Sequence, residues 1–170
     1  MSQKHIFDHV CDEKVYKKLF EELGENLFQF LRLKYQNEAL ARDGMQEAFI
    51  ALWKNCKNVT SSKAKSYLFT VGRNKVVDVL RQKNKHLSLV DDNRLTDEED
   101  DNGEINAEKK KLMDHILSKM PTSSKDAFLM NRVQGLKYAE IAEELDISVK
   151  AVEKRMMKAL KIIREELNQK

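Results

Sequence analysis

A chain of 170 residues is long enough for one ordinary domain or two small ones. It is 41% hydrophobic and 35% charged, with one proline and five glycines, which is typical of a soluble and mostly helical protein. The formal net charge of +3 says little by itself, but bases concentrate in residues 63–85 and 148–164 and acids in 91–108. No apolar run has the length of a membrane span, and the many charges in the first 30 residues argue against a signal peptide. We therefore expect a cytoplasmic protein that does not insert into a membrane.

Two cysteines, Cys11 and Cys56, stand alone without the spacing of a metal site. We expect them to be reduced thiols in a cytosolic protein. His5 and His9 lie close to Cys11 and Asp12, a grouping that suggests a zinc site. Nothing later in the chain completes a ligand pattern, so ordinary surface residues are the preferred interpretation. Neither a metal nor another cofactor is expected.

The spacing of apolar residues predicts two helices within residues 6–35, broken near Gly24, and a third over residues 39–56. One apolar stripe of the third helix consists of Ala41, Met45, Ala48, Phe49 and Leu52. A second apolar face carries Ile50 and Trp53. A helix with two apolar faces either lies deep in a core or offers one face to a partner, and the pattern leaves both open.

The basic stretch 63–85 predicts a helix of about six turns with a single acid, Asp78. The polar residues on one of its faces are Thr70, Asn74 and Arg81, flanked by Arg73. A short amide within a basic surface can read a base edge while the charges hold phosphates. A solvated amphipathic helix with a basic side is the alternative. A polar loop over residues 58–62 precedes this helix, with Ser61 or Ser62 as its N-cap.

Acidic residues crowd the stretch 86–105 with almost nothing to bury, which predicts a flexible linker between two lobes. The second lobe begins with a predicted helix over residues 107–120. N-cap candidates for the following helix, after Pro121, are Thr122, Ser123 and Ser124. That helix is expected to stop at Gly135.

The C-terminal part predicts a helix-turn-helix motif. A short helix over residues 138–145 is followed by a tight turn, with Ser148 as the N-cap of a long basic helix. In this motif the start of the second helix enters the major groove of duplex DNA. A helical hairpin for protein contacts is the alternative.

Together, these motifs resemble a bacterial RNA polymerase sigma factor of the sigma-70 family, extracytoplasmic-function (ECF) type. The resemblance lies in residues 39–53 (ALARDGMQEAFIALW), 66–81 (SYLFTVGRNKVVDVLR) and 116–165. It implies an all-α protein of two small helical domains joined by a flexible acidic linker. The implied parts are a region 2 domain at residues 1–88, a linker at 89–106 and a region 4 helix-turn-helix domain at 107–170.

The resemblance also implies roles for individual residues. Contacts with the β′ clamp helices of core polymerase are implied for Asp43, Gln46, Glu47, Ile50 and Trp53. Binding of the melted −10 element is implied for Asn58, Ser62, Lys63, Thr70, Arg73, Asn74, Lys75 and Arg81, with Asn74 near the pocket for a flipped-out base. Binding of the duplex −35 element is implied for Lys150, Ala151, Glu153, Lys154, Arg155 and Lys158. Of these, Arg155 suits a guanine edge or a phosphate, and Glu153 suits cytosine N4.

The function that follows from the resemblance is recognition of promoters by polymerase, with support for strand opening and no covalent chemistry. Further implied partners are the β flap of polymerase and an anti-sigma protein. One departure from the family is Gly44, which stands where leucine is common and is expected to weaken its helix by about 1 kcal/mol. The alternatives are a helix-turn-helix regulator with residues 1–85 as a sensor or dimerisation lobe, and a helical protein-binding adaptor.

Overall fold

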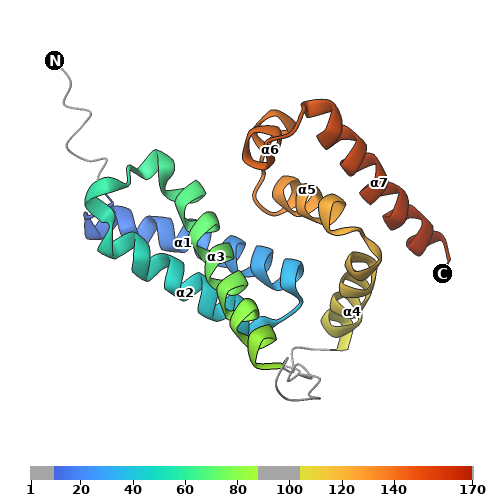
Figure 1. Cartoon of the computed structure of the whole chain (residues 1–170), viewed down its shortest axis with the longest axis horizontal. Coiled ribbons are helices and arrows are strands. Elements are labelled where there is room, and N and C mark those ends of the chain that lie inside the picture. The colour runs from blue at the N-terminus through green and yellow to red at the C-terminus, as the bar shows by residue number, and fades with distance from the viewer. Residues whose placement is uncertain (1–9, 88–103, 170) are drawn as a thin grey trace. The chain divides into compact units, whose positions relative to one another are not determined.

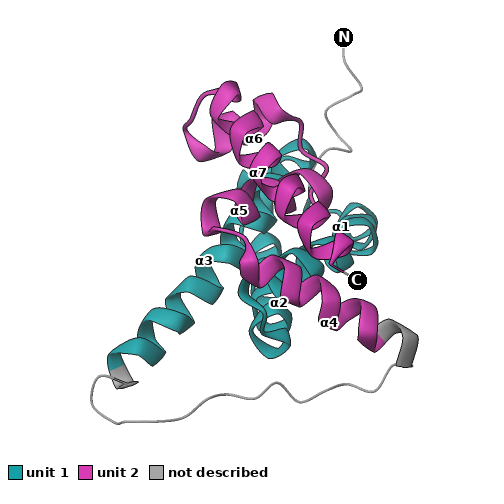
Figure 2. Ribbon diagram, turned by 90° about the vertical axis from the view of Figure 1, so that its right-hand side faces the viewer, with its two compact units in different colours: residues 1–97 teal, residues 98–170 magenta. Residues whose placement is uncertain are grey.

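A computed structural model describes residues 10–87 and 104–169, which form α-helices and a short 3-10 helix (Figure 1). The chain divides into two compact units, Met1–Asp97 and Glu98–Lys170 (Figure 2). The predicted all-α fold of two small helical domains is therefore confirmed. Most of the predicted linker, 89–106, lies outside the described residues, and the first helix of the second unit begins within its last three residues. No helix in the described ranges is long and apolar enough to cross a lipid bilayer.

The described part of the first unit, residues 10–87, contains three long helices and one short one. They are α1 (Glu13–Tyr35), α2 (Glu38–Lys54), the 3-10 helix η1 (Cys56–Asn58) and α3 (Ser61–Leu87). The expected break at Gly24 is wrong, because α1 runs through it without interruption and buries it. A Cβ at Gly24 would lie 4.0 Å from the ring of Phe20, so the packing leaves room for an unbroken helix.

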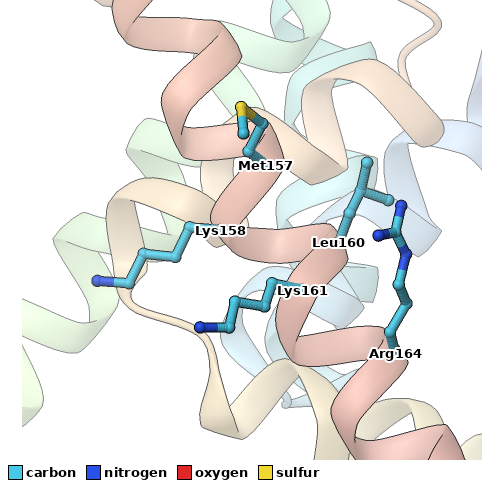
Figure 3. Close-up of a pocket in the computed structure, with 5 residues that line it drawn as sticks. All are labelled: Met157, Lys158, Leu160, Lys161 and Arg164. Carbon is cyan, nitrogen blue, oxygen red and sulfur yellow. The ribbon is translucent and has the colours of Figure 1, made fainter.

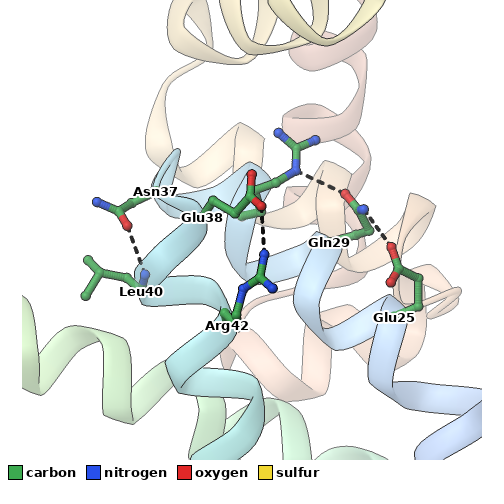
Figure 4. A network of polar contacts seen from close by, with 7 residues as sticks. Glu25, Gln29, Asn37, Glu38, Leu40 and Arg42 are labelled. Carbon is green, nitrogen blue, oxygen red and sulfur yellow. Dashed lines mark hydrogen bonds and ion pairs between the residues drawn. The ribbon is translucent and has the colours of Figure 1, made fainter. Parts of the chain in front are cut away.

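A tight connection makes α1 and α2 antiparallel (Figure 4). Gln36 adopts a left-handed conformation with φ 51°, and its N–H donates to the carbonyl of Arg32 at 2.7 Å. The side-chain oxygen of Asn37 then caps α2 by accepting from the N–H of Leu40 at 2.9 Å. The N-terminal end of α1 therefore meets the C-terminal end of α2.

The core of the first unit joins α1, α2 and α3. Its fully buried side chains include Leu27, Phe30, Leu31, Ala41, Ala48, Leu52, Ala64, Leu68 and Val76. Gly44 of α2 lies at the closest approach of these helices, because a Cβ there would stand 2.8 Å from Val76 Cγ2 and 3.1 Å from the carbonyl oxygen of Gly72. The glycine with low helix propensity is thus explained by tight packing of α2 against α3.

The second unit contains α4 (Glu104–Lys119), α5 (Thr122–Arg132), α6 (Tyr138–Leu145) and α7 (Val149–Asn168). Its buried side chains include Ile116, Leu117, Ala127, Leu129, Met130, Ile141, Val152, Met156 and Ala159. They follow helical spacing on α4, α5 and α7, which places the core between these helices and α6. The helix-turn-helix prediction is confirmed by α6, the turn and α7.

Some of the observed helix ends match the caps and stops predicted from the sequence, and others do not. Ser148 caps α7 as predicted, with its Oγ accepting from the N–H of Ala151 at 3.1 Å. The capping prediction for α5 is wrong, because Pro121 flanks the helix and makes no side-chain cap, while Ser124 is buried inside it. Gly135 has the left-handed φ of 70°, although α5 already ends at Arg132. α3 begins at Ser61, so Ser61 and Ser62 both lie inside the helix and the prediction of either as its N-cap is wrong.

Candidate protein and nucleic-acid interfaces

The residues expected to contact core polymerase lie along the outer side of α2, and we call this surface the docking face. Its members are Asp43, Gln46, Glu47, Ile50 and Trp53, all of them exposed and spaced by three or four residues. Ile50 and Trp53 are each 46% exposed, although both are large and apolar. The second apolar face of this helix therefore points to solvent rather than into the core. An exposed tryptophan with a polar border is typical of a binding hot spot.

Tyr16 of α1 contacts Trp53 of this face and the backbone of the neighbouring Phe49. Its ring meets the ring of Trp53 edge-on, with centroids 5.0 Å apart, and its hydroxyl donates to the carbonyl oxygen of Phe49 at 2.9 Å. Burial raises the pKa of the Tyr16 hydroxyl, so the group stays a neutral donor. No local sequence pattern reveals the role of Tyr16, because its partners on α2 lie more than 30 residues away.

The two cysteines are joined in a disulfide, so the expectation of reduced thiols is wrong. Cys11 lies just before α1, and Cys56 begins η1 after α2. The antiparallel pairing of α1 and α2 brings these ends together across 45 residues of sequence, with the two Cα atoms 5.0 Å apart. Spacing in the sequence could not show this proximity.

The residues expected to bind the −10 strand lie on α3 and the loop before it, and we call this surface the strand-binding face. Its members are Asn58, Ser62, Lys63, Thr70, Arg73, Asn74, Lys75 and Arg81. Asn74 and Arg81 are exposed, whereas Arg73 and Lys75 are half-buried. Arg81 lies 3.9 Å from Asp78, an exposed ion pair that leaves the guanidinium accessible. The loop residues lie at the start of α3, and Lys63 and Asn74 are separated by about 16 Å along the helix axis.

Local hydrogen bonds shape the loop before α3. Asn58 donates from Nδ2 to Oδ1 of Asn55 at 2.7 Å, and the hydroxyls of Thr60 and Ser62 lie 3.0 Å apart. Val59 between them is buried and anchors the backbone. The predicted loop, 58–62, thus overlaps the end of η1 at Asn58 and the start of α3 at Ser61 and Ser62. Asn58 and Ser62 are exposed on either side of the buried Val59.

The residues expected to bind the −35 duplex lie on the first half of α7, and we call this surface the duplex-binding face. Its members are Lys150, Ala151, Glu153, Lys154, Arg155 and Lys158. The lysines and Glu153 are exposed, while Ala151 and Arg155 are half-buried. Val152 and Met156 are buried against the rest of the unit, which fixes the rotation of α7 and turns the basic residues outward. The face is therefore a rigid helix surface with a net positive charge.

Farther along α7, a pocket is lined by Met157, Lys158, Leu160, Lys161 and Arg164 (Figure 3). Lys158 and Lys161 extend to the same side of the helix. Lys161 forms an exposed ion pair with Glu165 at 3.7 Å, which leaves its ammonium group accessible. All three charged residues that line the pocket are cationic, which suits an anionic ligand.

The suggested zinc grouping gains no support. His5 and His9 lie outside the described residues, and Cys11 is bonded to Cys56. Within the described ranges, no three histidine, cysteine or acidic residues are grouped so that they could hold a metal ion. The described surface carries the docking, strand-binding and duplex-binding faces, which suit protein and nucleic-acid partners.

Comparison with known families matches both units. Residues 19–86 match the family model for sigma-70 region 2, and residues 110–163 match that for sigma-70 region 4. The chain is 24% identical over 133 residues to the ECF RNA polymerase sigma factor SigM of Bacillus subtilis, covering 77% of this chain and 82% of that protein. It is 27% identical over 140 residues to the ferric citrate uptake sigma factor FecI of Escherichia coli, covering 79% and 80%.

Solved structures show the same fold. The sigma factor RpoE of Bartonella quintana, in complex with the anti-sigma factor NepR, has a TM-score of 0.76 at 17% identity and covers 91% of this chain and 98% of its own. CnrH in complex with the cytosolic domain of CnrY has a TM-score of 0.68 at 22% identity, covering 93% and 90%. Two helical domains in this order are therefore shared with both proteins.

Proposed function

Because this chain is an ECF-type sigma factor of the sigma-70 family, a non-catalytic subunit that directs RNA polymerase to promoters, we propose that its three faces divide that task. The docking face binds core polymerase, the strand-binding face holds the melted −10 element, and the duplex-binding face reads the −35 element. The first unit matches region 2 of the family, which disfavours a sensor or dimerisation role for it. The protein works in the cytoplasm, beside the polymerase it serves.

The docking face gives the strongest support for the proposal. Its target is the β′ clamp helices of polymerase. Trp53 and Ile50 keep nearly half of their surface exposed, as does Phe20 of α1, while the apolar side chains of the core are buried. Polymerase would cover this surface, while Asp43 and Glu47 supply the charged rim. Tyr16 holds the indole of Trp53 in one orientation, which lowers the entropy lost on binding.

The strand-binding face suits single-stranded DNA. Asn74 presents an amide that can donate and accept at the pairing edge of an unstacked base. Arg73, Lys75 and Arg81 surround it with positive charge for the backbone. Asn58, Ser62 and Lys63 at the other end of α3 extend the face, so that it follows a stretch of strand and not a single nucleotide.

The duplex-binding face suits the major groove. The guanidinium of Arg155 can donate two hydrogen bonds to the edge of a guanine, and the carboxylate of Glu153 can accept one from cytosine N4. Lys150, Lys154 and Lys158 are exposed and contact phosphates, which sets register without sequence preference. The same unit contacts the β flap of polymerase, which holds it over the −35 element.

An anti-sigma protein is a further proposed partner. RpoE of Bartonella quintana is seen in complex with the anti-sigma factor NepR, and CnrH with CnrY. This chain shares their fold and exposes Ile50 and Trp53 on its docking face. Such a partner would compete with core polymerase for the docking face, so a Trp53→Ala change should weaken both complexes.

Binding of core polymerase to the full chain tests the proposal. Trp53→Ala should raise the Kd by about 30-fold, the equivalent of a hot-spot loss of about 2 kcal/mol. Met113→Ala is the matched control, because Met113 is 42% exposed on α4 and belongs to none of the three faces. Equal Kd values for Trp53→Ala and the parent protein would refute the assignment of the docking face. A similar loss with Met113→Ala would show that the effect is not specific to that face.

A further inference from the structure

The disulfide between Cys11 and Cys56 lies at the edge of the strand-binding face. Cys56 begins η1, two residues before Asn58, and η1 leads directly into the start of α3. The bond therefore ties the segment that presents Asn58 and Ser62 to the residues just ahead of α1. Val10, next to Cys11, is fully buried, so this anchor point is itself packed against the unit.

The loop depends on this bond more than the helices do. The side-chain hydrogen bonds from Asn58 to Asn55 and between Thr60 and Ser62 are local and exposed, and such bonds compete with water. Val59 provides one buried side chain. α2, in contrast, is held by Phe49 and Leu52 in the core, together with the hydroxyl of Tyr16. Breaking the disulfide should therefore loosen residues 56–62 and leave the docking face in place.

Both cysteines are half-buried, so a dithiol can reach the bond. In a cytoplasm with a thiol reductant pool, disulfides are usually transient, catalytic or redox-sensing and not permanent structural links. The position of this bond beside a DNA-binding loop favours a sensing role.

We propose that the disulfide between Cys11 and Cys56 is a thiol–disulfide modification site that controls how much open promoter complex forms. The inference rests on the proposed function of the strand-binding face. In the oxidised protein the disulfide holds residues 56–62 in place, and this loop supports the melted DNA strand. In the reduced protein these residues move, and promoter opening weakens. Core polymerase binds both forms equally well.

The chemistry is a reversible exchange with a dithiol reductant. A thiolate of the reductant attacks one sulfur of the disulfide, the S–S bond breaks, and a mixed disulfide forms. The second thiolate of the reductant then displaces the remaining cysteine. Two electrons and two protons pass to the protein, which gains two thiols, and the reductant leaves as its own disulfide. The same steps in reverse restore the bond.

The test uses the full chain, core polymerase and a promoter fragment that the complex opens. Alkylation of free thiols followed by mass spectrometry confirms the redox state of each sample. If the loop is ordered about one fifth of the time after treatment with dithiothreitol, the amount of open complex should fall about fivefold, and the Kd for core should change by less than about twofold. The Cys11→Ser, Cys56→Ser double variant should remain at the lower level with or without dithiothreitol, which also controls for effects on polymerase.

Four results would overturn the inference. Equal opening by oxidised and reduced protein would show that the bond does not act on the strand-binding face. A parallel loss of core affinity would show that the bond supports the docking face instead. A response of the double variant to dithiothreitol would trace the effect to polymerase. Failure of both redox forms to bind core would refute the proposed function, and this inference with it.

Discussion

Tyr16 and Phe49 are joined by a hydrogen bond of 2.9 Å between the tyrosine hydroxyl and the phenylalanine carbonyl, across 33 residues of sequence. The bond links α1 to α2 directly beneath Trp53. Tyr16→Phe should therefore lower the free energy of unfolding by about 1 kcal/mol, because the carbonyl loses a donor while the aromatic packing remains. Chemical denaturation measures the change, and an unchanged midpoint would contradict it.

Alkaline pH should remove the contribution of the Tyr16 hydroxyl to the free energy of unfolding. Burial raises the pKa of Tyr16 in the folded state above the ordinary value of 10.0. The unfolded chain therefore loses this proton first, so the stabilisation is complete below pH 10.0 and is lost as pH rises through the higher folded value. The difference in unfolding free energy between the parent protein and Tyr16→Phe should shrink over this range. A constant difference would contradict the assignment, since ionisation of lysines is common to both proteins.

The crossing of α2 and α3 should not tolerate a methyl group at Gly44. Gly44→Ala places a Cβ 2.8 Å from Val76 Cγ2 and near the backbone of Gly72, so the unfolding free energy should fall by about 1–3 kcal/mol. Gly24→Ala is the matched control within a helix, because its nearest neighbour is 4.0 Å away. That change should be neutral or stabilise by up to about 1 kcal/mol. Equal effects of the two substitutions in thermal unfolding would contradict this account of the crossing.

The helices and the helix-turn-helix could be predicted from the sequence because they depend on local periodicity and caps. Ser148, for example, bonds an N–H only three residues away. The disulfide and the Tyr16 contact could not be predicted, since each joins α1 to segments more than 30 residues later. The break expected at Gly24 failed for the same reason, because packing between helices outweighed a local propensity.

The faces were predictable to different degrees. Helical spacing identified the residues of the docking face, but it left open whether Trp53 lay in the core or at the surface. Only the packing of Phe49 and Leu52 against α1 and α3 settled that question. The members of the strand-binding and duplex-binding faces came from charge and family resemblance, and their individual contacts with DNA stay predictions.

Within the duplex-binding face, Lys154 and Arg155 should behave differently. Lys154→Ala should weaken binding of all −35 sequences alike and reduce the slope of log affinity against log salt by about 1, as expected for one lost phosphate contact. Arg155→Ala should cost about 1–3 kcal/mol on the preferred sequence and relax the preference at one base pair. Lys119→Ala, an exposed change on α4, is the control. Identical salt slopes and sequence profiles for the two variants would argue against the division into phosphate and base contacts.

Run-off transcription with purified bacterial core polymerase on a pool of genomic fragments tests the central claim most directly. We expect transcripts that appear only when this protein is added, and whose start sites share one pair of −10 and −35 sequences. Asn74→Ala and Arg155→Ala, each folded as judged by circular dichroism, should abolish or strongly reduce them. Duplex binding through residues 136–165 without any dependent transcript, and without binding to core, would contradict the account and favour a conventional DNA-binding regulator.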